Sequence, residues 1–224
     1  MALILNIETS TKNCSVSIAR NGEVIHSKEI NDGNYSHAEK LHPFILDVLS
    51  EADVDRNSLD AIAVSKGPGS YTGLRIGVSA AKGLCFSLDV PLISVDTLLS
   101  LAHSISIEDG IIIPMLDARR MEVYSAIYDK NYEQVREIKA EVIEEDSFNA
   151  FNEQKVFFLG DGASKCKEVL NAANFNFIDG KFPSAIQMAK LSYDKYKKND
   201  IEDVAYFEPF YLKDFIVTPQ KKKV

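Results

Sequence analysis

The sequence predicts an α/β fold of two similar lobes, the second of them reduced. Three observations predict it: apolar stretches typical of buried strands alternate with helical patterns, each half opens on an apolar strand that ends in a carboxylate, and an alternating hairpin follows each of those strands. The two carboxylates, Glu8 and Asp117, stand 109 positions apart. We therefore expect a duplication, with the first lobe at 1–108 and the second at 109–224.

The first lobe is expected to open on a strand at 3–8 and a hairpin that turns at Asn21-Gly22, a dipeptide favoured in tight hairpin turns. Apolar periodicity predicts the remaining elements. They are helices at 36–52, 72–88 and 98–102 and strands at 61–65 and 92–95.

The second lobe is expected to repeat this order in a shorter form. Its elements are a strand at 111–117, hairpin strands at 121–129 and 134–141, a helix at 144–151, a strand at 156–159, and helices at 163–173 and 184–198. No linker rich in Pro, Gly or Ser separates the lobes, and residues 104–110 are the best boundary. The 107 residues after Asp117 are few for a lobe that closes over a nucleotide.

A glycine-rich turn and the helix after it form the most distinctive stretch, GPGSYTGLRIG at 67–77. Gly and Pro favour a sharp turn, and Ser70 or Thr72 can cap the helix. The helix lacks a polar half, which predicts cover on two sides. The only polar side is a narrow stripe at Arg75, Ser79 and Lys82. Gly73 and Gly77, with Ala80, Ala81 and Leu84 continuing their row, leave a nearly bare face that another helix could approach closely. We expect the protein's own sheet to cover one side and another subunit to cover the second.

The helix at 36–52 supports the same prediction. It has an inward apolar stripe, and Phe44 lies at the edge of that stripe. Two interpretations of Phe44 remain open: its ring anchors another subunit, or it completes the protein's own core. The residues expected at a partner interface are His37, Lys40, Leu41, Phe44, Val48, Gly73, Leu74, Gly77, Val78 and Ala81.

Composition narrows the function classes. The chain has 224 residues with 46% hydrophobic content, lacks a membrane-length apolar run and a signal peptide, and is expected to be a cytoplasmic protein that contacts no membrane. Its three cysteines are expected to be buried free thiols. A net charge of −8 argues against a broad nucleic-acid surface. The basic tail at 221–223 is either simply solvated or a weak tRNA contact.

Four stretches together resemble one known family: residues 4–11, the glycine run at 67–77, Asp-Ala-Arg-Arg at 117–120 and Pro-Phe-Tyr-Leu-Lys at 209–213. They are similar to the TsaB (YeaZ) family of bacterial tRNA threonylcarbamoyladenosine biosynthesis proteins, relatives of TsaD. The resemblance covers most of the chain, and the glycine run is its most specific part. It implies a two-lobed actin-like fold of the sugar-kinase and Hsp70 type, and a role in modifying tRNA beside the anticodon.

The resemblance also implies a scaffold or activator subunit that does not carry the transfer chemistry. Proteins of this family bind the catalytic paralogue TsaD and work with the ATPase TsaE, so we expect both partners, tRNA contact only through the complex, and a homodimer when the chain is alone. The contact helices map onto 36–52 and 72–88. An older family label, glycoprotein endopeptidase, finds no support because the chain lacks serine, cysteine and metalloprotease motifs.

An actin-like nucleotide-binding protein with weak ATPase or kinase-like activity is the alternative. Related folds hold phosphates between the loops of their two lobes, and hydroxyls, cations and free amides are suitable ligands. Turnover is not expected, because no Walker motif is present and Glu8 stands where ATP-hydrolysing relatives carry Asp. The candidate nucleotide-binding residues are Thr9, Ser10, Lys12, Gly67, Gly69, Arg119, Gly160 and Gly162.

Metal binding is not expected. His37 and His42 are five residues apart, so they lie on different sides of a helix, whereas two ligands on one face need a spacing of three or four. No resident cofactor is expected either, with ATP or ADP binding left open.

Overall fold

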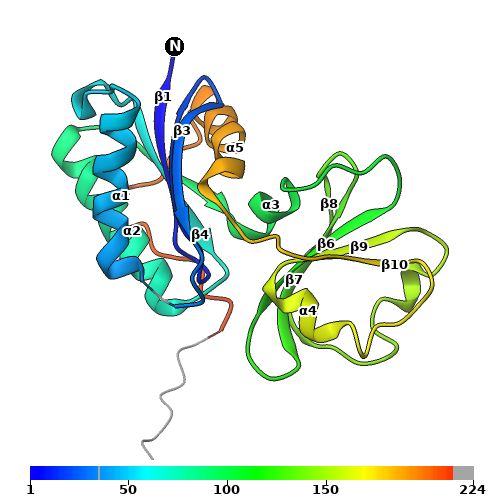
Figure 1. The fold of residues 1–224 in the computed structure, drawn as a ribbon. Helices are drawn as coiled ribbons and strands as arrows, with labels where there is room; N and C mark the ends of the chain where they lie inside the picture. The colour runs from blue at the N-terminus through cyan, green and yellow to red at the C-terminus, as the bar shows by residue number, and fades with distance from the viewer. Residues whose placement is uncertain (35, 214–224) are drawn as a thin grey trace, which may run out of the picture.

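The structure, a computed structural model, describes residues 1–34 and 36–213 and consists of two lobes, each built on a five-stranded sheet (Figure 1). The first sheet has the order β3-β2-β1-β4-β5, and the second has β8-β7-β6-β9-β10. The first-lobe strands are β1 (Leu3–Glu8), β2 (Cys14–Arg20), β3 (Glu23–Ile30), β4 (Ala61–Gly67) and β5 (Leu92–Asp96). The second-lobe strands are β6 (Ile111–Asp117), β7 (Glu122–Asp129), β8 (Gln134–Val142), β9 (Val156–Leu159) and β10 (Phe175–Ile178).

The two sheets correspond strand by strand. In each lobe the first three strands are antiparallel, and the later two run parallel to the first. This shared topology confirms the predicted duplication.

Helices cover both faces of the first-lobe sheet (Figure 1). On one face lie α1 (His37–Glu51) and α2 (Tyr71–Leu88), which bury their apolar sides over β1, β2 and β4. On the other face lies α5 (Ala185–Lys197), whose Met188 is buried among residues of β1, β4 and β5. The remaining helices are α3 (Thr97–Ala102), α4 (Asp161–Cys166), and short 3-10 turns at Arg56–Ser58 and Asn149–Phe151.

The turn into α2 forms as its sequence predicts. Gly67 takes a φ of +112°, which favours glycine, and Ser70 caps the helix by accepting a hydrogen bond from the Gly73 amide. The helix ends at Asp89, which adopts a left-handed conformation. Its N-terminus is therefore held at the carboxyl end of β4, beside the loop that follows β1.

The last helix corrects the expected lobe assignment. The sequence predicts the second lobe at 109–224, but α5 packs on the first-lobe sheet. The chain after α5 also runs along the first lobe, where the Glu202 amide donates to Leu92 O and the Phe210 amide to Lys66 O. The physical reason is that β1, β4 and β5 are apolar on both faces, so the face opposite α1 and α2 also needs cover.

Two predicted second-lobe helices are wrong in extent. Residues 144–151 form only a 3-10 turn at their end, and the helix expected at 163–173 spans Asp161–Cys166. The chain then extends into β10, a strand missing from the prediction, which pairs with β9 and brings Phe177 against Phe158. Burial of these aromatic rings outweighs the helical pattern before it.

The cysteines are free and buried, as expected. Burial raises the pKa of the Cys14 and Cys85 thiols to about 12. Within residues 1–34 and 36–213, no helix has the length and apolar character needed to cross a bilayer. The basic tail at 221–223 lies outside the described residues.

Candidate functional site

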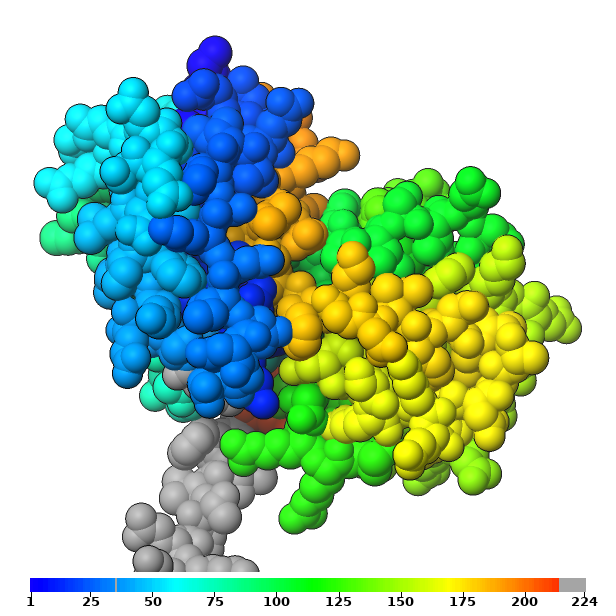
Figure 2. All heavy atoms as spheres, viewed as in Figure 1, coloured from blue at the N-terminus to red at the C-terminus, as the bar shows by residue number. Residues whose placement is uncertain are grey.

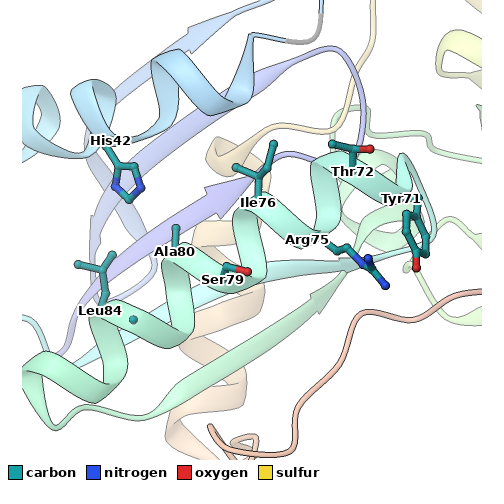
Figure 3. A pocket seen from close by; sticks show the side chains of 9 residues that line it. His42, Tyr71, Thr72, Arg75, Ile76, Ser79, Ala80 and Leu84 are labelled. Carbon is teal, nitrogen blue, oxygen red and sulfur yellow. The ribbon is translucent and has the colours of Figure 1, made fainter.

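A groove runs along the outer side of α2, beside α1 (Figure 3). It has a volume of about 680 Å³. Its apolar residues are Ile76, Ala80 and Leu84, which are half-buried and lie along one side of α2. The polar lining residues are His42 of α1 and Tyr71, Thr72, Arg75 and Ser79 of α2, and Gly83 leaves the helix backbone bare. A partner helix could therefore approach α2 closely here.

Two large apolar side chains on the same helices are exposed. Phe86 on α2 is 87% exposed, and Leu46 on α1 is 66% exposed. Both lie within one helical turn of a groove residue, Phe86 after Gly83 and Leu46 after His42. Exposed apolar residues beside an apolar groove are typical of a protein interaction surface.

Most of the predicted interface residues lie beneath this surface rather than on it. Leu41, Val48 and Ala81 are fully buried, and Leu74 and Val78 are almost so. They pack in or beside the first-lobe core, so the prediction that these side chains contact a partner is wrong. The two predicted helices do line the groove, but the outward side of α2 lies nearly half a turn away from the predicted residues, at Ile76, Ser79 and Gly83.

The glycine face of α2 also points inward. A Cβ on Gly73 would lie 2.1 Å from the backbone oxygen of Thr9, and one on Gly77 would lie 2.2 Å from Thr9 Oγ1. Thr9 Oγ1 donates to Gly73 O at 2.8 Å. The close approach predicted for another helix is instead made by the protein's own β1–β2 loop.

The residues expected on α1 take several positions. Phe44 is half-buried against the first-lobe core, which agrees with the second of its two interpretations. His37 is buried, and its Nε2 lies 2.7 Å from Thr11 O. Burial lowers the pKa of His37. Lys40 is half-buried, and His42 faces the groove (Figure 3).

The predicted interface residues do not include the apolar groove residues Ile76, Ala80 and Leu84 or the exposed Leu46 and Phe86 beside the groove. The sequence placed Ala80 and Leu84 only in the row that continues from Gly73 and Gly77. A usable signal was present, because Ile76, Ala80 and Leu84 form an i, i+4, i+8 apolar row on a helix that already has a separate buried row.

A second hollow lies between the lobes. Figure 2 shows the lobes as two distinct masses with α5 (orange) between them on the visible face. The interlobe cleft has a volume of about 1010 Å³. Its lining includes the β1–β2 loop, the first turn of α2, the β6–β7 loop and the segment Phe210–Lys213.

The cleft brings together half of the candidate nucleotide-binding residues. Ser10, Lys12, Gly69 and Arg119 line it. Thr9, Gly67, Gly160 and Gly162 are not among its lining residues. Each of these four contacts the protein's own backbone: Thr9 bonds Gly73, and Cβ atoms on the three glycines would meet Phe210, Met115 and Leu116.

The two strand-end carboxylates differ in exposure, and each has one oxygen engaged by the protein's own groups. Glu8 is fully buried, and its Oε1 accepts from the Ser10 amide at 2.6 Å and from Ser65 Oγ at 2.9 Å. Burial raises the pKa of the Glu8 carboxyl. Asp117 lines the cleft, but its Oδ1 pairs with Lys165 Nζ at 2.5 Å and accepts from the Arg119 amide. One oxygen of each carboxylate is therefore engaged, whereas Glu8 Oε2 is buried without a hydrogen-bond partner among the described residues and the Asp117 side chain is 47% exposed.

Asp161 is the third acidic group at this cleft. Its Oδ1 accepts from the Asp117 amide at 3.1 Å, and burial raises the pKa of its carboxyl. The acidic residues of the second lobe thus support the β6–β7 loop. Among residues 1–34 and 36–213, no group of three or more His, Cys, Asp or Glu side chains has a metal-binding arrangement.

The duplicated sheets and the cleft between them define a two-lobed protein with the actin-like fold. A protein-family model described as "TsaD: tRNA N6-adenosine threonylcarbamoyltransferase" matches residues 31–215. The structure of YeaZ from Pseudomonas aeruginosa is similar with a TM-score of 0.79 at 26% identity, covering 95% of this chain and all of that one. The ethanolamine utilization protein EutJ from Carboxydothermus hydrogenoformans shares the fold, with a TM-score of 0.50 at 10% identity.

Comparison with curated relatives indicates the same family. The chain is 29% identical to the tRNA threonylcarbamoyladenosine biosynthesis protein TsaB of Haemophilus influenzae, over 94% of this chain and 93% of that protein. It is 28% identical to the Escherichia coli protein of that name, over 94% of each. The chain belongs to the TsaD-related family, and within it to the TsaB (YeaZ) proteins.

Proposed function

We propose that the chain is an accessory, non-catalytic subunit in the biosynthesis of tRNA threonylcarbamoyladenosine, and that it binds a TsaD-like catalytic paralogue through the groove along α2. The observation that carries this proposal is the exposed apolar surface around that groove, with Phe86 87% exposed. The names of the TsaB relatives support the pathway.

The groove suits a helix of a related protein. Ile76, Ala80 and Leu84 provide an apolar row, and Gly83 allows a partner backbone to approach without a side chain between. Arg75 and His42 place donors at the rim, where they favour carboxylate or backbone oxygen on the partner. Burial of Phe86 and Leu46 on association would supply the apolar contribution.

The same surface accounts for two further parts of the proposal. In the absence of the catalytic paralogue, two copies of the chain would cover it in a homodimer. A TsaE-like ATPase and tRNA would then join through the assembled complex, which agrees with a net charge of −8 on this subunit.

Absence of turnover is proposed from the carboxylates. A phosphoryl-transfer site needs acidic groups free to hold a metal ion. Here the Glu8 carboxyl is buried and bonded to Ser10 and Ser65, and Asp117 is paired with Lys165. Calorimetry and a phosphate-release assay with ATP on the isolated chain test this directly, and steady hydrolysis would favour the nucleotide-dependent alternative.

The docking proposal is tested with Gly83→Glu. A Cβ at Gly83 meets nothing within 4 Å, so the substitution adds charge to the groove without a clash inside the subunit. We expect the affinity for the TsaD-like paralogue to fall by about 30-fold or more, as at a binding hot spot, with an unchanged unfolding midpoint. Titration calorimetry or surface plasmon resonance measures the affinity, and thermal unfolding measures the midpoint.

The matched control is Ile186→Glu, a charge added to an exposed apolar position of α5 on the opposite side of the first-lobe sheet. It should leave the affinity unchanged. Equal binding by the Gly83→Glu variant and the parent chain would remove the docking proposal. Gly77 and Ala81 are unsuitable for this test because both are buried.

A further inference from the structure

The segment after α5 returns along the first lobe (Figure 1), and its last described residue contacts the second lobe. Its last described part, Phe210–Lys213, is here called the C-terminal strap. The Phe210 amide donates to Lys66 O at 2.7 Å, next to the glycine turn before α2. Gly67 accommodates this contact, because a Cβ there would lie 2.8 Å from Phe210 O. One end of the strap is thus fixed to the first lobe by backbone contacts.

The other end of the strap reaches the second lobe. Lys213 Nζ forms an ion pair with the Glu122 carboxylate at the start of β7. Phe210, Tyr211, Leu212 and Lys213 all line the interlobe cleft. Four consecutive residues therefore span the cleft from the end of β4 to the start of β7.

The two lobes are also joined at α3, away from the strap. Short α3 packs against β6 and β7, and its Leu98 and Leu101 share a buried cluster with Leu116 and Leu159 of the second lobe. That cluster is suited to act as a hinge, since it joins both sheets at one place. The strap contact lies across the cleft and away from this cluster. A contact in that position can limit how far the two lobes separate.

The strap also contacts the docking groove. Arg75 Nε donates to Tyr211 Oη at 3.1 Å, and the Arg75 guanidinium lies 4.0 Å from the centre of the Tyr71 ring. The Tyr71 and Tyr211 rings are 4.8 Å apart. Tyr71 and Thr72 line both the groove and the cleft. The first turn of α2 therefore lines both the groove and the interlobe cleft.

We propose that the C-terminal strap is a clasp that holds the two lobes together, fastened to the second lobe by Lys213 and Glu122 and to the groove by Tyr211 and Arg75. A molecule that engages Arg75 in the groove competes with Tyr211 for it and loosens the clasp. Occupancy of the groove thereby changes the width of the interlobe cleft. The inference does not depend on which partner binds the groove.

The test measures lobe separation in the isolated full chain. Spin labels on Asn31→Cys and Arg120→Cys flank the cleft from the two lobes, and the native cysteines are buried away from the reagent. Double electron–electron resonance should give one main distance in the labelled parent chain. Lys213→Glu places like charges opposite each other and should raise the ratio of open to closed molecules, by up to about fivefold for an exposed pair.

Three further variants test which contacts are responsible. Glu122→Lys combined with Lys213→Glu restores an opposite-charge pair and should restore the parent distance distribution. Arg75→Ala should widen the distribution although residue 75 lies far from the second-lobe anchor in sequence, whereas Ser79→Ala, a groove residue one turn along, should not.

An unchanged distribution in Lys213→Glu overturns the clasp. Failure of the charge exchange to restore the distance overturns the assigned pair, and an effect of Ser79→Ala as large as that of Arg75→Ala overturns the link to the groove. Because partner binding is not the readout, these outcomes are independent of the docking experiment.

Discussion

The Cα of Gly77 lies so close to Thr9 that a Cβ on the glycine would be 2.2 Å from the threonine Oγ1. The same threonine hydroxyl donates to Gly73 O one turn earlier. A side-chain-poor helix face thus contacts the loop after β1, and the opposite face remains for other molecules. The orientation of α2, and with it the position of the proposed docking surface, follows from this contact.

Gly73→Ala should destabilise the protein by about 1–3 kcal/mol, as overpacking does in a well-packed interior. The new Cβ would lie 2.1 Å from a backbone oxygen, which cannot move aside as a flexible side chain can. Urea denaturation followed by circular dichroism measures the change. Gly83→Ala on the same helix is the control, and it should stabilise the protein by up to about 1 kcal/mol because that position is open. Equal effects of the two substitutions would contradict the packing described here.

Comparing Phe44→Ala with Leu46→Ala distinguishes a side chain of α1 that packs on the core from one that is exposed at the surface. Phe44 packs partly against the core, so its loss should cost about 1–3 kcal/mol, below the 3–5 kcal/mol of a fully buried Phe. Leu46 is 66% exposed, so its loss should change stability by at most about 0.5 kcal/mol. Thermal unfolding measures both. On binding to the catalytic paralogue the order should reverse, and a larger binding defect for Phe44→Ala at equal folded fraction would favour the anchor interpretation.

Glu8→Gln should alter how stability depends on pH. The folded-state pKa of Glu8 is raised by burial, so ionisation costs folding free energy, and this cost is absent below the unfolded pKa of about 4.3. It grows as the pH rises from that value toward the folded pKa and is constant above it. The stability of the glutamine variant relative to the parent should therefore increase with pH over this window. Urea titrations between pH 4 and pH 8 measure the difference, and a difference that falls with pH would show that the ionised carboxylate is the favoured form.

The duplicated architecture could be predicted because it follows from local patterns. Each half carries a short apolar strand, a carboxylate and an alternating hairpin, and these patterns depend on neighbouring residues alone. The helix start at Ser70 and the left-handed Gly67 were likewise accessible, since caps and turns use the chemistry of a few consecutive residues.

The candidate site could be predicted from the sequence only in part. The sequence pointed to α1 and α2, but it placed the interface on Leu41, Val48, Gly73 and Ala81, all of which are buried. The narrow polar stripe at Arg75, Ser79 and Lys82 marked the outward side, where Arg75 and Ser79 are exposed, but the prediction followed the glycine row instead. The extent of α4 and the presence of β10 were missed for a related reason, because contacts with Phe158 outweigh local propensity.

By itself, then, the sequence determined the two-lobed fold class, the family and the two helices on which we propose the docking surface, because periodicity, turn chemistry and motifs depend on adjacent residues. Tertiary structure alone decided the outward side of α2, the return of α5 to the first-lobe sheet and the crossing of the strap to Glu122. Those features depend on which distant segments meet, such as Thr9 with Gly77, and the steric and solvation energies of such contacts have no local signature.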